Sequence, residues 1–143
     1  MPGSPHGTFE FEREGNVIHM TLSGTSNEEG AQARTEALRA FWEDWVAREG
    51  RPQRWAMLVD LRQWQGATPE AFAYSAITLR WAIANGLSAA ANIVADPLLQ
   101  HIVKRHLDRA EQAMAATVVT DMFEARQWLR EQGFALGSDP VSD

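Results

Sequence analysis

Residues 55–61 constrain the fold of this chain more than any other segment. They read Trp-Ala-Met-Leu-Val-Asp-Leu, so every position except Asp60 is apolar. A strand with one face in water alternates apolar and polar residues, whereas a strand covered by helices on both faces is apolar throughout. The segment therefore predicts the central strand of a mainly parallel sheet that is covered by helices.

The segments before this strand predict a β-hairpin and a long helix. Residues 9–13 and 17–22 alternate apolar and polar side chains around a short Glu-Gly-Asn turn, which is typical of a hairpin with one covered face. Residues 24–27 then offer N-cap side chains to a helix that extends to about Glu49 and stops at Gly50. The apolar stripe of this helix has the spacing i, i+3, i+4, i+7 and consists of Leu38, Phe41, Trp42 and Trp45.

The remaining segments alternate between helix and strand patterns. Thr68 and Pro69 suit the N-cap and the first position of a helix that ends near Gly86. A hairpin followed by such alternation predicts an α/β fold, with a four- or five-stranded, mostly parallel sheet and helices packed on it. The elements expected after Gly86 are a strand over residues 89–95, a helix from Asp96, a strand over 116–120 and a helix over 121–132.

The chain length of 143 residues suits one domain. We expect this domain to span residues 8–134, where the helix and strand patterns lie. The Pro-, Gly- and Ser-rich ends over residues 1–7 and 135–143 are predicted to be flexible tails.

Three segments together resemble the SpoIIAA-like family, which belongs to, or stands beside, the STAS (sulfate transporter and anti-sigma-factor antagonist) domains. They are the hairpin that leads into Gly24, Leu-Val-Asp-Leu at 58–61, and Thr-Asp-Met-Phe-Glu-Ala-Arg-Gln-Trp-Leu at 120–129. The resemblance covers residues 8–134. It implies a small SpoIIAA-like domain that binds partners, nucleotides or apolar small molecules and is not typically an enzyme.

The resemblance also raises the question of a phosphorylation switch. In the anti-sigma antagonists proper, a Ser in an Asp-Ser-(Ser/Thr)-Gly turn after the central strand is phosphorylated. Residues 60–69 of this chain lack that turn, and Thr68 is the one hydroxyl in reach. Thr68 is therefore the candidate phospho-acceptor that the resemblance implies.

Composition argues against several other classes of function. The absence of cysteine excludes disulfides, thiolate metal sites and a cysteine nucleophile. The net charge of -6 and a single lysine, Lys104, argue against nucleic-acid binding, which depends on clustered basic residues. No segment has the pattern of a signal peptide or a membrane span, so we expect a cytoplasmic protein without membrane insertion.

Polar side chains are expected at the carboxyl ends of the parallel strands, where ligands collect in such sheets. Asp60, Asp96 and Asp121 would lie at this edge, and they could serve a divalent metal or phosphate transfer. Asp96 and Asp121 each precede a helix, however, so N-capping explains them. Asp60 forms a candidate strand-end polar cluster with Arg62, which could satisfy the carboxylate. We predict no metal site and no cofactor, and keep a weak phosphatase or phosphotransfer activity of Asp60 as an alternative.

The helix after Thr68 is the most informative feature for function. Between Ala71 and Leu87, Arg80 is the only charged residue, and such a helix must be covered on more than one side. The cover could be a second subunit, another protein, a small apolar ligand, or the helix that starts at Asp96. We therefore predict a non-enzymatic binding module, expected to form a homodimer or bind a protein partner. The alternative is a small-molecule or lipid carrier with a cleft beside residues 69–86. The candidate binding residues are Trp64, expected in the loop after the central strand, with Tyr74, Ile77, Arg80 and Trp81.

Overall fold

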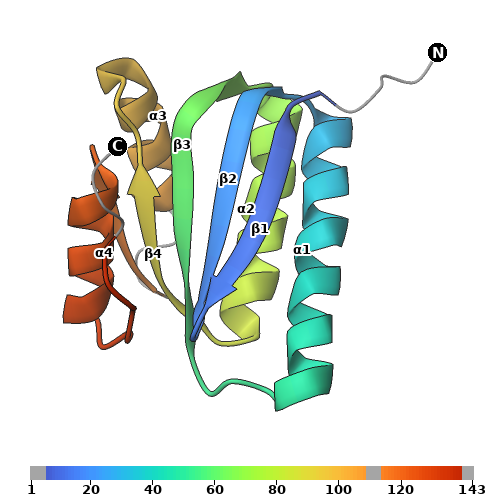
Figure 1. The fold of residues 1–143 in the computed structure, drawn as a ribbon. Coiled ribbons are helices and arrows are strands. Elements are labelled where there is room, and N and C mark those ends of the chain that lie inside the picture. Colours follow the sequence, from blue (N-terminus) through green and yellow to red (C-terminus); the bar gives the residue numbers. More distant parts are fainter. Residues whose placement is uncertain (1–5, 109–113, 140–143) are drawn as a thin grey trace.

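The computed structural model describes residues 6–108 and 114–139. Its outer residues 1–5 and 140–143, which belong to the predicted tails, lie outside the described part. Strands and helices alternate along the chain after an initial hairpin (Figure 1). In order they are β1 (Thr8–Glu14), β2 (Val17–Ser26), α1 (Glu28–Glu49), β3 (Trp55–Ala67), α2 (Pro69–Ala84), β4 (Leu87–Ile93), α3 (Pro97–Asp108), β5 (Ala115–Val119) and α4 (Met122–Glu131).

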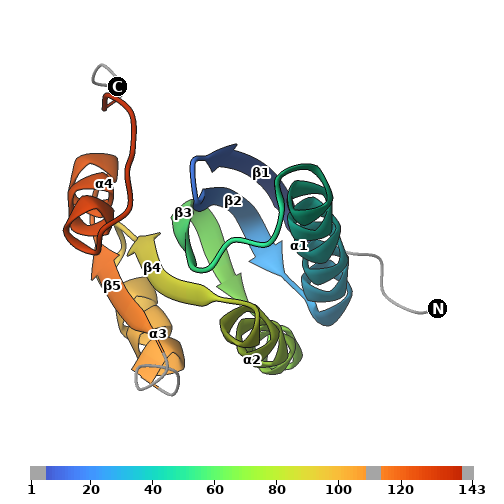
Figure 2. The same cartoon turned by 90° about the horizontal axis from the view of Figure 1, so that it is seen from below.

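The strands form one sheet of five strands in the order β1-β2-β3-β4-β5. β1 pairs with β2 in the antiparallel sense, and every later pair is parallel. The predicted α/β class, with its hairpin and mostly parallel sheet, is therefore confirmed. Figure 2, which looks along the strands, shows α1, α2 and α3 on one face of the sheet and α4 on the other.

Two hydrophobic cores follow from this layering. The larger core lies between the sheet and the three helices α1, α2 and α3, and it contains all four buried tryptophans, Trp42, Trp45, Trp55 and Trp64. The smaller core lies under α4, where Ala125 and Leu129 meet the opposite side of β3 and β4. Alternate residues of β3 enter different cores, which explains why residues 55–61 are apolar on both faces.

The helix starts carry the N-caps that their sequences predict. The side chains of Asn27, Thr68 and Asp121 each accept a hydrogen bond from the backbone N–H three residues later, at 2.8, 3.1 and 2.8 Å. Gly86 follows α2 with a φ of 103°, a left-handed conformation that glycine adopts without strain. These local signals set the helix limits within one or two residues of the predicted ones.

β3 is longer than the sequence indicates, and this corrects one predicted position. Trp64 was expected in a loop, but the strand continues to Ala67, so Trp64 is a strand residue. The continuation is possible because β2 extends to Ser26 and pairs with residues 63–67. Two register shifts between Thr21 and Thr25 accommodate the extension.

The segment after α4 lies against the end of β1, where the backbone N–H of Gly137 donates to the Glu14 carboxylate. Arg126 of α4 is only 4% exposed, and its guanidinium donates hydrogen bonds to the Glu14 carboxylate at 2.7 and 3.1 Å. It also donates to Asp139 and to the carbonyl oxygens of Gly137 and Ser138. The described part of the predicted C-terminal tail, residues 135–139, is thus held against β1 and α4. The limits of the domain stay a prediction.

Candidate ligand cavity

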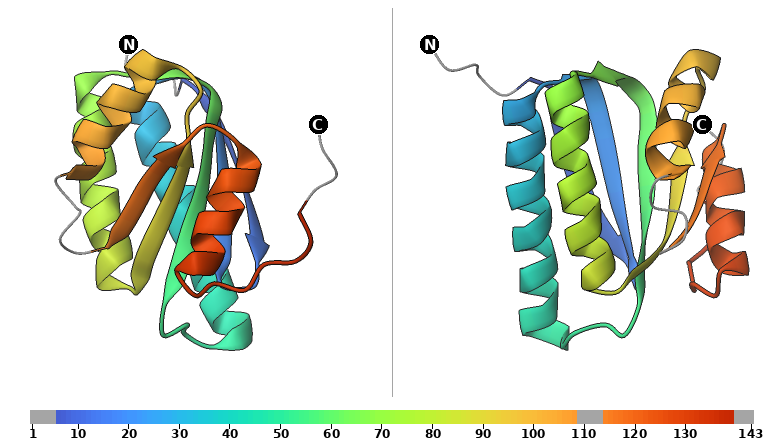
Figure 3. Two further views of the ribbon diagram at one scale, coloured as in Figure 1. Left: turned by 90° about the vertical axis from the view of Figure 1, so that its left-hand side faces the viewer. Right: turned by 180° about the vertical axis from the view of Figure 1, so that it is seen from behind.

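α2 lies between α1 and α3 on the sheet, as Figures 2 and 3 show from two directions. On the α1 side, the Trp81 ring meets Trp42 edge to face, with ring centroids 5.7 Å apart. On the α3 side, Phe72 lies 5.8 Å from His106, again between ring centroids. The apolar character of α2 is therefore largely explained by its two neighbouring helices and the sheet beneath it.

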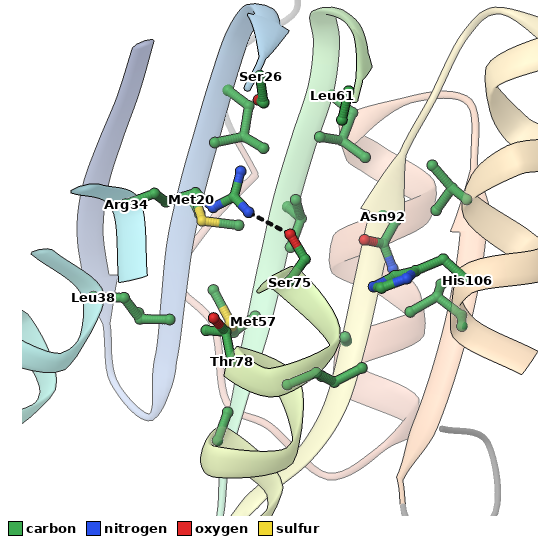
Figure 4. Close-up of a pocket in the computed structure, with 18 of the residues that line it drawn as sticks. Met20, Ser26, Arg34, Leu38, Met57, Leu61, Ser75, Thr78, Asn92 and His106 are labelled. Atoms are coloured by element: carbon green, nitrogen blue, oxygen red, sulfur yellow. Dashed lines mark hydrogen bonds between the residues drawn. The ribbon is translucent and has the colours of Figure 1, made fainter. Parts of the chain in front are cut away.

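The helices do not fill the space above the sheet completely. A cavity of about 150 Å³ lies beneath α2, bounded by α1 on one side and α3 on the other (Figure 4). The sheet contributes mainly apolar side chains to it, among them Met20, Leu22, Met57, Val59, Leu61, Trp64 and Ala90. The helices contribute Leu38, Phe72, Leu79, Ala82, Val103 and Leu107, together with several polar side chains.

The polar side chains lie at two opposite ends of the cavity (Figure 4). Asn92 of β4 and His106 of α3 form one end, and the amide of Asn92 donates to the carbonyl oxygen of Thr117 at 3.2 Å. Ser26, Arg34 and Ser75 form the other end, beside β2. A mainly apolar chamber with a few polar groups is the usual architecture of a small-molecule site.

Two further hydroxyls of the cavity wall serve structure. Thr35 and Thr78 are buried, and their oxygen atoms lie 2.6 Å apart in a hydrogen bond that joins α1 to α2. Each oxygen also lies within hydrogen-bond distance of a carbonyl oxygen of its own helix, Thr35 of Ala31 and Thr78 of Tyr74, so one hydroxyl donates to its own helix while the other donates across the pair. Since both hydroxyls are already satisfied within the protein, they are weak candidates for ligand contacts.

Arg34 is the charged side chain that α1 contributes to the cavity wall. Its Nη2 donates a hydrogen bond of 2.6 Å to the hydroxyl of Ser75, across the gap between α1 and α2. Burial lowers the pKa of the guanidinium below its ordinary value, because the charged form loses hydration. Burying a charged guanidinium in this position costs hydration free energy, and the attraction of an anionic partner would offset that loss.

The predicted binding residues separate into two groups. Trp64 is 6% exposed and lines the cavity, with its ring edge-to-face against Phe72. Ile77 and Arg80 lie on the outer, exposed side of α2, while Tyr74 and Trp81 are half-buried. The five residues thus do not share one surface.

Asp60 and Arg62 are direct partners within β3. Arg62 donates to both carboxylate oxygens of Asp60, from Nε at 3.0 Å and Nη2 at 2.8 Å, and its backbone N–H adds a third bond. Burial raises the pKa of Asp60, but the hydrogen bonds from Arg62 outweigh it, and the net pKa lies below its ordinary value. Asp60 is therefore held as an ionised, hydrogen-bonded carboxylate, a poor state for a general acid.

Thr68 is part of the capping structure of α2. Its side-chain oxygen accepts from the N–H of Ala71, and its own N–H donates to the carbonyl of Ser26. Its role as a phospho-acceptor stays a prediction.

Sequence reasoning did not identify Arg34, although a signal was present. Arg34 stands four residues before Leu38, in line with the apolar stripe of Leu38, Trp42 and Trp45. A charged residue on the buried side of a helix is unusual, so it indicates either a structural ion pair or a binding site. That its side chain lines a cavity depends on where α2 crosses α1, which local sequence does not reveal.

Within residues 6–108 and 114–139, no group of three or more His, Cys, Asp or Glu side chains could hold a metal ion. In the same part of the chain, no helix combines the length and apolar character needed to cross a membrane.

No protein-family model matches this chain, and no curated protein matches its sequence. Solved structures match its fold. An uncharacterized protein of the DUF3478 family with a SpoIIAA-like fold, from Shewanella loihica PV-4, superposes with a TM-score of 0.60. It is 16% identical, over 90% of this chain and 98% of the other.

An anti-sigma factor antagonist from Mycobacterium paratuberculosis superposes with a TM-score of 0.58. It is 17% identical, and the match covers 87% of this chain and 95% of that protein. Both matches span nearly whole chains, so they concern the entire domain and not one motif within it. The chain has the SpoIIAA-like fold that its sequence resemblance predicted.

Proposed function

We propose that this protein is a binding module of the SpoIIAA-like type that takes a small apolar ligand beneath α2 and acts without catalysis. The observation that carries the proposal is the cavity of about 150 Å³ lined mainly by apolar side chains. An apolar cavity of about this volume, engineered into another protein, stays dry and binds benzene. The cavity here is thus large enough for a ligand of roughly six carbon atoms.

A regulatory role is consistent with this reading. One protein of the same fold is an anti-sigma factor antagonist, which is a regulator of other proteins. A ligand under α2 would contact α1, α2 and α3 together, so binding could alter how these helices present their outer surfaces.

We expect the chain to bind hexan-1-ol, a neutral probe of suitable size, and to report it through tryptophan emission. Trp64 lines the cavity, so ligand entry changes the surroundings of its ring. In the variant Ala90→Leu, the added carbon atoms point into the cavity from β4 and replace the ligand. Fluorescence titration and calorimetry should show binding by the natural chain and at least about a tenfold weaker affinity in the variant.

The matched control is Ala73→Leu, which adds the same atoms at an exposed position of α2. It should bind hexan-1-ol as the natural chain does. Because Ala90→Leu fills existing space, its free energy of unfolding should change by less than about 1 kcal/mol. Equal binding by both variants would show that the cavity is not the binding site.

A second candidate function, binding of a protein partner or a second copy, is favoured by the outer side of α2. Ile77 is 50% exposed there, between the exposed Ala73 and Ala84, with Arg80 beside it. Exposed apolar side chains next to an arginine are common in the centres of protein interfaces.

If this surface mediates a homodimer, Ile77→Glu should yield a folded monomer, because a buried unpaired carboxylate is costly at an interface. Ile77 is a sharper site for this test than Trp81, whose ring packs on Trp42 and would disturb the core if replaced. Sedimentation velocity of the natural chain and of the variant measures the effect, and Arg80→Gln controls for charge. A natural chain that remains monomeric at high concentration would contradict self-association.

A further inference from the structure

Arg34 places a positive charge at one end of a cavity whose walls are mainly apolar. The side chain comes from α1 and reaches over β2 toward Ser75, as the dashed line in Figure 4 shows. Ser26, which is 5% exposed, lies at the same end of the cavity. The walls between the two ends, over Met57 and Ala90, are apolar. A ligand in this space therefore meets a cation and two hydroxyls at one end, hydrocarbon along its middle, and the side chains of Asn92 and His106 at the far end.

The charge of Arg34 has no counter-ion in the described residues. None of the ion pairs between residues of the ranges 6–108 and 114–139 includes Arg34. Its one hydrogen bond to another described residue, Ser75, uses one of the five N–H donors of a guanidinium. The other nitrogen atoms of Arg34 are not fully enclosed, so they keep some access to solvent at the cavity wall.

We propose that the cavity takes a short monocarboxylate, with the carboxylate on the guanidinium of Arg34 and the apolar tail over the sheet, in contact with the cavity wall that Trp64 and Phe72 form. The planar carboxylate matches the fork of N–H donors in arginine and can accept two parallel hydrogen bonds. One guanidinium balances one negative charge, which favours a single carboxylate over a more highly charged group. The volume limits the tail to roughly six carbon atoms.

The proposal rests on the proposed ligand cavity, and the test separates the two. Three probes of equal chain length, hexanoate, hexan-1-ol and hexylamine, are titrated by calorimetry into the full chain. Hexanoate should bind at least about ten times more tightly than hexan-1-ol, because charge-assisted hydrogen bonds replace neutral ones. Hexylamine should bind most weakly, since its ammonium group meets the guanidinium.

The deciding variant is Arg34→Met, which keeps an unbranched side chain and removes the charge. It should bind hexanoate about tenfold to a hundredfold more weakly and hexan-1-ol within about threefold of the natural chain. The control is Arg39→Met on the same helix. The Arg39 guanidinium lies over the ring of Trp81, 5.0 Å from the ring centroid, and Arg39 does not line the cavity. It should leave the binding of all three probes unchanged. Circular dichroism confirms folding, and Arg34→Gln, which can still bond Ser75, replaces the methionine variant if that variant does not fold.

Each outcome has one meaning. Equal affinities of the natural chain for hexanoate and hexan-1-ol would show that the guanidinium of Arg34 stays hydrated and does not bind the carboxylate. This result would overturn the carboxylate proposal, but the proposal of an apolar ligand cavity would stand. Loss of both ligands in the Arg34 variant, in a folded protein, would show a structural role for Arg34 and overturn it equally. Failure of the natural chain to bind any of the three probes would overturn the cavity function itself.

Discussion

Replacing Arg126 with methionine should lower the free energy of unfolding by about 2–4 kcal/mol at neutral pH. The guanidinium is 4% exposed and makes two hydrogen bonds to the Glu14 carboxylate, which is itself only partly exposed. Methionine leaves Glu14 without its main partner and removes the donor to the carbonyl oxygen of Ser138, while the carbonyl oxygen of Gly137 keeps its hydrogen bond from Arg130. Guanidinium chloride unfolding, followed by circular dichroism, measures the loss.

The same network makes the free energy of unfolding depend on pH in the acid range, because Glu14 and Asp139 both have a pKa that is lowered by hydrogen bonds to arginine. The hydrogen bonds from Arg126 lower the pKa of Glu14 from 4.5 to about 2, although burial opposes the shift. Because the unfolded chain binds this proton more readily, the contribution of the pair is complete above about pH 4.5 and disappears as the pH falls toward 2. The difference in stability between the natural chain and Arg126→Met should therefore shrink between about pH 5 and pH 2.5.

A matched control distinguishes this pair from arginine replacement in general. Arg48 pairs with Asp44 on the exposed side of α1, and both side chains are 63% exposed. Arg48→Met should change stability by no more than about 0.5 kcal/mol, with no acid dependence of its own. If Arg126→Met unfolds at the same denaturant concentration as Arg48→Met, the network around Arg126 does not stabilise the fold.

The features that the sequence predicts are those with a local cause. The hairpin follows from alternation around Gly15, the starts of α1 and α2 from their N-caps, and the central position of β3 from its continuous apolar run. Each of these depends on residues within one element and its immediate flanks. For that reason they appear in the structure close to their predicted positions.

The features that the sequence misses depend on distant partners. Residues 62–67 are too polar to indicate a buried strand, and Gly66 favours a turn, yet residues 63–67 pair with the end of β2. Arg126 looks like an exposed residue of the last helix until residues 137–139 and Glu14 surround it. Arg34 meets Ser75, which lies 41 residues away along the chain. In each case, tertiary packing decides what the residue does.

Tertiary packing also decides where the candidate binding residues lie. Aromatic content directed attention to Trp64 and to the Tyr74, Ile77 and Trp81 face of α2, but the packing of α1 divides them between an interior and an exterior. The small residues that create the cavity, such as Ala82 and Ala90, carry no chemical signal in the sequence. An empty volume results from the sum of many side-chain sizes, which no single motif records.

Replacing Trp64 with alanine should cost about 3–5 kcal/mol of stability and at the same time change which ligands the protein accepts. The side chain is 6% exposed, packs edge to face against Phe72, and forms part of the cavity wall. Removal of the indole therefore enlarges the cavity by roughly the volume that the indole occupied. The variant should then bind octan-1-ol and decan-1-ol better than hexan-1-ol, whereas the natural chain should favour the shorter alcohol.

Trp55→Ala separates ligand selection from simple loss of stability. Trp55 is fully buried, packs against Trp45 and donates to the carbonyl of Asn85, but it does not line the cavity. Its replacement should cost a similar 3–5 kcal/mol or so and leave the preference for chain length unchanged. Where either alanine variant fails to fold, Trp64→Leu and Trp55→Leu make the same comparison with smaller cavities. A shift toward longer alcohols in both variants would mean that general loosening, and not the wall at Trp64, sets ligand size, whereas a shift confined to the Trp64 variant would locate the ligand beneath α2.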